Sequence, residues 1–368
     1  MKVCELRLTS FRNYTKERIC FSPNLNYLVG NNGEGKTNLL EALFLLATTR
    51  SHRQAGEKDM VTIGEDYFLV SAQIETLSTN RAIDIGYYLS LKKKVARVSG
   101  LPVTRLHDIV GLFNVVLFSP EDLALVKGSP RDRRRFLDVL LCQVDKVYFR
   151  LLQQYAQVLK QRNEALKSIA RGSFKAQDIR PWDEQFASIA LRITARRAQA
   201  VDRLAENFRF LTGEINRGQE TLRLAYRGSL CATTAKPDTE SVRLELERRL
   251  SEDVRRGVSS LGPHRDDLSF LINGLPAEDY ASQGQQRTAV LGLKLAELKY
   301  MQEVTGDYPV LLLDDVLSEL DPKRRQMIVH VLMSDVQALV TGTDENDLVL
   351  TGGRPVQVMR IERGKVVC

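Results

Sequence analysis

The sequence predicts an α/β protein in which a long helical block interrupts one domain. Short β-rich segments and one helix fill the first third of the chain, and strands alternate with helices again after residue 258. Between these parts, apolar residues recur mainly at helical spacing. We therefore expect a discontinuous domain with a mixed sheet that has an antiparallel part, residues 1–120 and 259–368, and an inserted α-helical lobe, residues 121–258.

The first third of the chain is expected to fold as strands around one helix. The helix covers residues 37–48 and is apolar almost all round, which is typical of a buried helix. The β segments are recognised by β-branched and aromatic residues and by the turn residues that separate them. The expected elements are a strand at 25–29, a hairpin over 67–91 that turns at 77–80, a second hairpin around 99–102 and a strand at 114–118.

The helical block starts with a clear signal. Ser129-Pro130 gives an N-cap followed by proline at the first helical position. Apolar residues at a period of 3.5 from Leu137 to Val158 then predict one long helix. This seam fits either the core of an antiparallel helical domain or an interaction coiled coil, and we favour the core because Gly172 and Pro181 let the chain fold back. Further helices are expected over 182–216 and 239–256.

After residue 258 the chain returns to short strands and helices, which we assign to the same domain as the first third. The apolar runs are four to six residues long and are separated by helical segments, as in α/β folds. The expected elements are strands at 268–272, 309–314, 336–340 and 356–361, and helices at 285–300 and 322–333.

Composition and charge exclude several classes of protein. Hydrophobic residues make up 43% of the chain and charged residues 27%, as in ordinary globular proteins. No apolar run approaches the roughly 20 residues of a membrane span, the N-terminus does not have the layout of a signal peptide, and the five cysteines form no C-x-x-C pair. We expect a cytoplasmic protein. Its net charge of +7 favours a polyanionic partner such as nucleic acid, although charge alone is weak evidence.

Residues 30–37 fit the phosphate-binding motif G-x-x-x-x-G-K-[ST] in full, with a strand before it and a helix after it. The glycines let successive backbone amides point inward at a helix N-terminus, where they bind anions. We expect Lys36 to reach the β- and γ-phosphates of a nucleotide and Thr37 to ligate Mg²⁺. The candidate nucleotide-binding residues of this loop are Gly30, Asn31, Asn32, Gly33, Glu34, Gly35, Lys36 and Thr37.

A second motif, residues 310–315, is an apolar run that ends in two carboxylates. Buried parallel strands have this pattern, and ligands bind at their carboxyl ends. We expect Asp314 to hold Mg²⁺ directly or through water, and Asp315 to orient or deprotonate the water that attacks the γ-phosphate. Asp315 and Lys36 are therefore candidate catalytic residues, and Thr37 and Asp314 are candidate metal ligands.

A third motif begins at Ser282 and opens a predicted helix. Serine and glycine at a helix start make a phosphate-binding end, although a plain capped helix is the alternative. The order of residues resembles the signature motif of ABC-type ATPases, in which this segment contacts the γ-phosphate bound to the partner subunit. Residues 317–321 are similar to the D-loop of the same class. The candidate nucleotide contacts in the signature segment are Ser282, Gln283, Gly284 and Gln285.

These motifs occur in the order of ABC-type ATPases, and the helical insertion before the signature segment is similar to the SMC-like branch of that class. Within this branch, segments along nearly the whole chain resemble the RecF family. The segments are SFRNY at 10–14, TRSHR at 49–53, FSPEDL at 118–123, KGSPRDRRRFLD at 127–138, GPHRDDL at 262–268, SQGQQR at 282–287 and LLLDDVLSELD at 311–321.

The resemblance implies an ABC-type ATPase head with a short helical lobe in place of a long coiled coil. It further implies binding of ATP and Mg²⁺, an ATP-dependent homodimer, and DNA binding at gaps and single-strand/double-strand junctions. It implies work with RecO and RecR to load RecA in recombinational repair, replication and the SOS response to DNA damage. We expect slow, DNA-stimulated ATP hydrolysis, because Asp315 stands where most relatives have the longer glutamate.

The chain departs from the wider ABC class after the strand at 336–340. Many relatives carry a histidine there that contacts the γ-phosphate, whereas this chain has Thr341-Gly342-Thr343. Either threonine hydroxyl is able to donate a neutral hydrogen bond in its place. The segment FSPEDL at 118–123 is the best match by order to the Q-loop of the class.

Three consecutive arginines follow Ser129-Pro130 in the first turns of a predicted helix, where the macrodipole disfavours exposed cations by ~0.3–1 kcal/mol each. DNA phosphates would compensate this cost, and so would ion pairs with Asp132, Asp138 or Glu121. A fourth arginine follows the P-loop helix and is placed to face DNA or a partner subunit. The candidate DNA contacts are Arg133, Arg134, Arg135 and Arg53.

Two other functions share some of these motifs. The ATPase subunit of a membrane transporter has the same P-loop, signature and carboxylate motifs, but it needs a membrane partner and normally carries the switch histidine. A metabolic P-loop kinase needs a pocket for its acceptor substrate and has no signature helix. We therefore favour an ATP-gated DNA-binding dimer.

Overall fold

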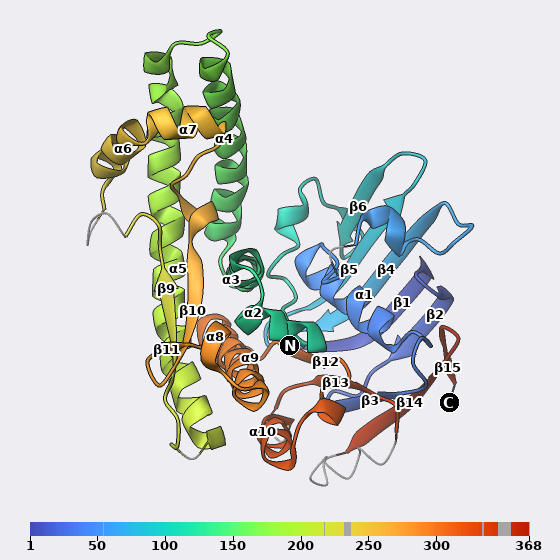
Figure 1. The fold of residues 1–368 in the computed structure, drawn as a ribbon. Helices are drawn as coiled ribbons and strands as arrows, with labels where there is room; N and C mark the ends of the chain where they lie inside the picture. Colours follow the sequence, from blue (N-terminus) through green and yellow to red (C-terminus); the bar gives the residue numbers. More distant parts are fainter. Residues whose placement is uncertain (54, 217, 232–236, 333–334, 345–354, 368) are drawn as a thin grey trace.

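The computed structural model describes residues 1–53, 55–216, 218–231, 237–332, 335–344 and 355–367. The head contains two six-stranded sheets. Figure 1 shows the head beside an elongated lobe of long helices. The α/β fold with a mixed sheet and a helical lobe is confirmed. No helix within these residues is both long and apolar enough to cross a membrane.

One sheet of the head is antiparallel and has the strand order β2-β1-β4-β5-β6-β7. Both predicted hairpins are confirmed, with turns at residues 76–79 and 99–100. One face of the sheet is buried, since alternate residues of β4 point into the core. Its strands are β1 (Lys2–Phe11), β2 (Tyr14–Cys20), β4 (Tyr67–Glu75), β5 (Asn80–Tyr88), β6 (Lys93–Val98) and β7 (Leu101–Pro102).

The other sheet of the head has the order β15-β14-β3-β13-β12-β8 and is parallel except for its edge strand β15. Helix α1 (Lys36–Thr48) lies between the two sheets and is buried on nearly every side, as its sequence predicts. The strands are β3 (Leu25–Val29), β8 (Val115–Phe118), β12 (Val310–Leu313), β13 (Ala338–Gly342), β14 (Val356–Glu362) and β15 (Lys365–Val367).

The lobe differs from the prediction in its first helix. Two helices, α3 (Pro130–Val144) and α4 (Lys146–Ala170), replace the single helix expected to run past Val158. The break is at Asp145, whose Oδ1 accepts hydrogen bonds from the amides of Val147 and Tyr148 at 2.9 and 3.0 Å. An N-cap aspartate therefore outweighs the continuous apolar seam. Most of the seam is buried in the core of the lobe, as favoured over a coiled coil. The other lobe helices are α5 (Arg180–Asn216), α6 (Thr239–Arg248) and α7 (Leu250–Arg256).

The boundary expected at residue 258 falls between two strands that pair in one sheet. A third sheet, in the order β11-β10-β9, pairs β10 (Asp267–Ile272) antiparallel with β9 (Leu222–Arg227) and lies along α5 of the lobe (Figure 1). The strand predicted at 268–272 was expected in the head, but its partner strand lies inside the helical block. Strand β9 was not predicted at all. We propose that the lobe continues at least through β11 (Leu275–Pro276).

The remaining helices connect the two parts. Helix α9 (Gln283–Thr305) packs so closely on α5 that a Cβ atom at Gly292 would lie 2.3 Å from Cγ2 of Thr212. Helix α10 (Pro322–Leu332) follows the second motif, and the expected end at Met333 lies outside the described residues. The short elements are α2 (Ala124–Lys127), α8 (Ala277–Tyr280) and the 3-10 turns η1 (Glu57–Met60), η2 (Leu106–Asp108), η3 (Pro120–Leu123), η4 (Ala176–Ile179), η5 (Pro263–Arg265) and η6 (Leu317–Glu319).

Candidate nucleotide-binding site

A cavity of 270 Å³ lies at the carboxyl ends of strands β3, β12 and β13. Parallel pairing places these three strand ends next to one another, with Leu313 opposite Val340 and Gly342 opposite Val29. Ligands of α/β sheets bind at this edge. The cavity is lined by Asn32, Gly33, Gly35, Lys36, Thr37, Asn38, Arg53, Asp314, Asp315 and Thr341.

The loop before α1 has the geometry of an anion-binding nest. Gly33 and Gly35 have φ angles of 84° and 119°, a region that side chains rarely adopt, and Gly35 is the N-cap of α1. Lys36 is 6% exposed, and its Nζ donates to the carbonyls of Gly30 at 2.6 Å and Asn31 at 3.0 Å. Burial lowers the pKa of Lys36, and the carboxylates of Asp315 and Asp314 oppose that shift. The loop therefore presents amides and one cation to a phosphate.

The two candidate metal ligands lie side by side. Thr37 Oγ1 donates to Asp314 Oδ1 at 2.9 Å, and Thr341 Oγ1 donates to the same oxygen at 2.9 Å. Burial raises the pKa of Asp314, against the effect of both hydroxyls. Mg²⁺ prefers one or two protein oxygens, with phosphates and waters in its other positions. A hydroxyl and a carboxylate at this distance fit that ion.

Asp315 lies at the same edge with φ at 55°, in the left-handed region that aspartate tolerates better than most residues. Its amide donates to Thr341 Oγ1 at 2.8 Å, so Thr341 contacts both aspartates of the motif. Of the two threonines considered from the sequence, Thr341 is buried and lines the cavity, whereas Thr343 is exposed. Thr341 is therefore the residue that stands at the nucleotide pocket.

The P-loop rests on a support that the motif analysis missed. Asn13 Nδ2 donates to the Glu34 carbonyl at 2.9 Å, and the Tyr14 hydroxyl donates to the Gly35 carbonyl at 3.0 Å. From the other side, the Gly364 amide donates to the Glu34 carbonyl at 2.9 Å. The turns β1–β2 and β14–β15 thus hold the loop between them. In the sequence, the SFRNY segment was noticed only as part of the family resemblance, and no role was assigned to Asn13 or Tyr14.

Glu34 was predicted to contact nucleotide, but its carboxylate accepts a hydrogen bond from the amide of Arg363. It does not line the cavity, and neither do Gly30 and Asn31, whose carbonyls instead accept from Lys36. The contact of these three residues with a nucleotide stays a prediction.

Arg53 lies at the nucleotide pocket. Its Nη1 donates to Asn38 Oδ1 at 3.0 Å and lies 4.0 Å from Glu41 Oε2. Glu41 is fully buried and is held by the Arg12 guanidinium through two hydrogen bonds of 2.8 and 2.6 Å. The structure thus connects Arg53 with the nucleotide pocket and with the β1–β2 turn.

The three consecutive arginines of α3 are engaged within the protein. Arg133 is 4% exposed and forms two hydrogen bonds, of 2.8 and 3.0 Å, to the carboxylate of Asp267. Arg134 donates to the carbonyl of Asp266 at 2.7 Å, and Arg135 donates to the carbonyls of Ser51 and His52. This burial favours an ion pair over a DNA contact for Arg133, and the carboxylate that pairs with it is not one of those expected from the sequence.

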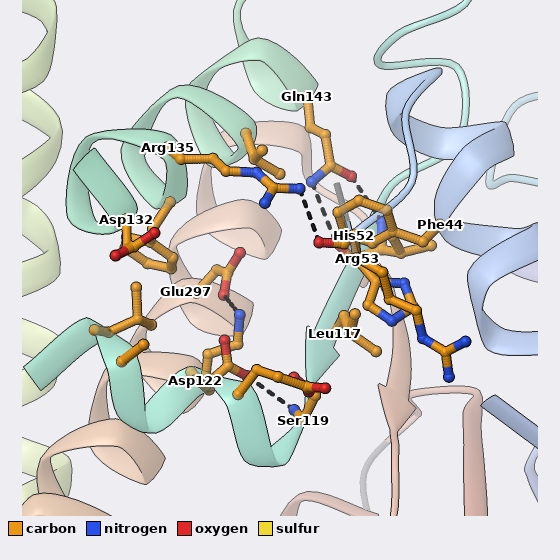
Figure 2. Close-up of a pocket in the computed structure, with 17 residues that line it drawn as sticks. Phe44, His52, Arg53, Leu117, Ser119, Asp122, Asp132, Arg135, Gln143 and Glu297 are labelled. Carbon is orange, nitrogen blue, oxygen red and sulfur yellow. Dashed lines mark hydrogen bonds and ion pairs between the residues drawn. The ribbon is translucent and has the colours of Figure 1, made fainter. Parts of the chain in front are cut away.

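A second cavity, of 340 Å³, borders the first because Arg53 lines both (Figure 2). Its walls come from α1, the segment after β8, α3 and α9, and a buried ion pair of Lys294 with Glu297 at 2.5 Å lies on the α9 side. The segment after β8 is the expected Q-loop match, and the Asp314 amide donates to the Phe118 carbonyl at 2.9 Å at its start. This segment therefore connects the second motif with α9.

The signature segment lies outside the nucleotide pocket of its own chain, since none of its residues lines that cavity. Ser282 is the N-cap of α9, where its Oγ accepts from the Gln285 amide at 3.3 Å and its amide donates to Gln285 Oε1 at 2.7 Å. The amides of Gln283 and Gly284 have no acceptor within the helix at this position. Ser282 and Gln283, at the start of α9, are exposed.

Comparison with known proteins agrees with this arrangement. The model of the RecF/RecN/SMC N-terminal domain matches residues 2–366. The DNA replication and repair proteins RecF of Shouchella clausii and Symbiobacterium thermophilum are 41% and 42% identical to this chain over 354 and 356 residues. Each alignment covers 95% of this chain, with 94% and 93% of the respective relative.

Two kinds of solved structure are similar to this one. One is a structure of the recombination mediator protein RecF with ATP, in the RecFOR pathway. The superposition covers 99% of this chain and 96% of the RecF chain, with 34% sequence identity and a TM-score of 0.90. An SMC head bound to the C-terminal winged-helix domain of ScpA covers 100% of this chain and 98% of its own, with a TM-score of 0.58 at 15% identity, and so shares the fold alone.

The fold, the P-loop and the two aspartates at the neighbouring strand end define an SMC-like head of the ABC-type P-loop ATPases. Among these proteins, the chain belongs to the RecF family.

Proposed function

We propose that this protein is an ATP-dependent DNA-binding protein of recombinational repair. ATP binding drives two copies together on gapped DNA or at single-strand/double-strand junctions in the cytoplasm, and the dimer acts with RecO and RecR to promote RecA loading. The observation that supports this most is the separation of two phosphate-binding ends in one chain. The P-loop, Asp314 and Asp315 line one pocket, whereas the first turn of α9 lies outside it.

This separation favours a site shared between two chains. The P-loop amides and Lys36 suit the β- and γ-phosphates of ATP. The amides of Gln283 and Gly284, which have no acceptor within helix α9, suit a phosphate presented by the partner. When bound, Mg²⁺ would neutralise charge on the phosphate oxygens, held by Thr37 and Asp314. ATP thereby becomes part of the dimer interface, and dimerisation is linked to ATP binding.

Hydrolysis is assigned to Asp315. Its carboxylate lies at the pocket and its backbone is fixed by Thr341, so it is placed to orient or accept a proton from the attacking water. An aspartate reaches one methylene less far than a glutamate and aligns this water less well. We therefore propose a slow ATPase, stimulated by DNA, in which the ATP-bound dimer persists long enough to mark a DNA site.

The relatives are named as DNA replication and repair proteins. These names favour a DNA-binding protein over the ATPase subunit of a membrane transporter. The net charge of +7 is consistent with phosphate contacts. Because Arg133 is buried in an ion pair, we propose that DNA is contacted by cations that remain exposed on the surface.

A DNA-retention experiment tests the proposed function. The full-length protein is incubated with a labelled gapped duplex, with ATP or without nucleotide, at a series of salt concentrations. We expect retention that needs ATP and falls steeply with salt, because counterions are released where cations meet phosphates. The Lys36→Ala variant, which loses the cation of the P-loop, should retain no more DNA with ATP than without it. Retention that is independent of ATP and of salt would contradict the proposal.

A further inference from the structure

The first turn of the signature helix α9 is held by an arginine from a different element. Arg324 of α10 donates through Nη2 to the carbonyl of Gly284 at 2.5 Å and to the hydroxyl of Thr288 at 2.7 Å. Its Nε donates to the same hydroxyl at 2.9 Å. The absence of a side chain at Gly284 permits this approach, since a Cβ atom there would lie 3.3 Å from Nη2. The guanidinium of Arg324 therefore contacts the start of α9 at Gly284 and Thr288.

The same guanidinium also contacts the D-loop. Its Nη1 forms an ion pair with the carboxylate of Asp321, the last residue of the segment that resembles a D-loop. The other oxygen of that carboxylate accepts from the amides of Lys323 and Arg324 at 3.0 and 3.1 Å. One side chain, 19% exposed, thus joins the signature helix to the D-loop within a single chain.

Two effects at this position disfavour a positive charge in the monomer and oppose the ion pair with Asp321. Positive charge at a helix N-terminus adds to the positive end of the macrodipole. Burial, and then the nearby charge of Arg287, lower the pKa of Arg324. A phosphate in front of the first turn of α9 would offset both effects, because an anion is attracted by the helix N-terminus and by the guanidinium.

We propose that Arg324 is a positioning residue. It holds the signature turn at Gly284 and the D-loop at Asp321 in one fixed arrangement. This arrangement receives the γ-phosphate of ATP bound to a second copy of this chain. The inference rests on the proposed ATP-driven dimer and assigns the residue that makes two of its interface elements act as one unit. Arg324 acts through the backbone of Gly284 and through Asp321 and is not itself assigned a contact with ATP.

The test compares Arg324→Met with the parent and with Lys323→Met. Lys323 is an exposed cation next to it on α10, so its replacement removes the same charge without the link. We expect Arg324→Met to weaken ATP-dependent dimerisation by about tenfold or more, the usual effect of losing charge-assisted hydrogen bonds. ATP affinity of the monomer should stay within about twofold of the parent, because the P-loop is untouched. Lys323→Met should dimerise like the parent.

Two further variants separate positioning from simple structural support. Thr288→Val removes one acceptor of Arg324 and should weaken dimerisation in the same direction, and the double variant should be no weaker than Arg324→Met alone. Arg324→Lys keeps the charge but not the fork, and should restore part of the loss. Thermal unfolding of each variant without nucleotide is measured alongside.

The results distinguish this inference from the proposed function. A parent protein that does not dimerise with ATP overturns both. A parent that dimerises while Arg324→Met dimerises equally well overturns the role of Arg324 alone. Equal loss of thermal stability, ATP affinity and dimerisation in Arg324→Met also overturns it, since that pattern reports only a damaged fold.

Discussion

The hydroxyl of Thr341 donates a 2.9 Å hydrogen bond to the carboxylate of Asp314. The same hydroxyl accepts the amide of Asp315 at 2.8 Å, so one buried threonine fixes the first aspartate through its side chain and the second through its backbone. Thr341 is in β13, which pairs in parallel with β12 and brings the two strand ends together. We propose that neutral hydrogen bonding at this position takes the place of the histidine that many ABC-type ATPases carry.

Replacing Thr341 with valine keeps its shape but removes both hydrogen bonds. We expect ATP hydrolysis to slow by about tenfold, because the carboxylate of Asp314 and the backbone of Asp315 lose their common partner. ATP affinity should change little, since the P-loop is intact. Steady-state hydrolysis and ATP titration measure the two effects. Thr343→Val, at an exposed position nearby, is the control and should behave like the parent.

Replacing Arg133 with methionine should destabilise the fold and leave DNA binding by the folded protein unchanged. The substitution leaves the carboxylate of Asp267 without its guanidinium partner, which we expect to cost about 2–3 kcal/mol. Urea unfolding gives the free energy, and DNA titration below the transition gives the affinity. Arg131→Met, at an exposed position of the same helix, should leave stability unchanged. A loss of DNA affinity without loss of stability in Arg133→Met would return that residue to the DNA interface.

The stability of the protein should fall as pH drops from about 6.5 to 4. Burial lowers the pKa of His264 to about 4, while Tyr155 and the carbonyl of Ser259 contact its two ring nitrogens. In this window the unfolded chain binds the proton and the native state does not, so acid favours unfolding. At pH 5 the pKa shift of His264 lowers the free energy of unfolding by roughly 2 kcal/mol, by the usual conversion of pKa shifts.

The variant His264→Gln tests this origin of the acid sensitivity. Glutamine does not titrate, so the free energy of unfolding should fall less between pH 7 and pH 5 than in the parent. Chemical unfolding at the two pH values measures the difference. His52, whose pKa burial also lowers to about 4, should account for part of the remaining dependence. An identical pH dependence in parent and variant would show that His264 does not titrate in this range.

Asp315→Asn should keep ATP binding and stop turnover. The amide cannot accept the proton of the attacking water, so hydrolysis should fall by about 100-fold. Asp314 and Thr37 remain in place to hold Mg²⁺, and ATP-bound dimers should therefore accumulate. Single-turnover hydrolysis and light scattering follow the two quantities. Hydrolysis at the parental rate would remove Asp315 from the catalytic role.

The elements that depend on neighbouring residues were predictable from the sequence. The P-loop, the two hairpins and the strand before Asp314 each carry their signal within about ten residues, as turn residues, glycine spacing or an apolar run. The division of α3 from α4 was missed, because the apolar seam continues through Asp145 and conceals the cap.

Contacts between distant parts of the chain gave no such signal. Strand β9 was missed because its partner β10 lies some 45 residues further along. The same pairing favours a lobe that continues beyond residue 258. Arg133 pairs with Asp267 across 134 residues, and Asn13 supports Glu34 from another sheet. Motif spacing contains no information on such pairs.

The most direct test of the shared site is the effect of Ser282→Arg on ATP-induced dimerisation, followed by light scattering with and without ATP. An arginine at the start of α9 would fill the space that a partner's phosphate needs, while the P-loop of the same chain stays intact. We expect the parent to double its mass on addition of ATP and Ser282→Arg to remain a monomer that still binds ATP. If Ser282→Arg dimerises with ATP as the parent does, the two chains do not share the nucleotide, and the account fails.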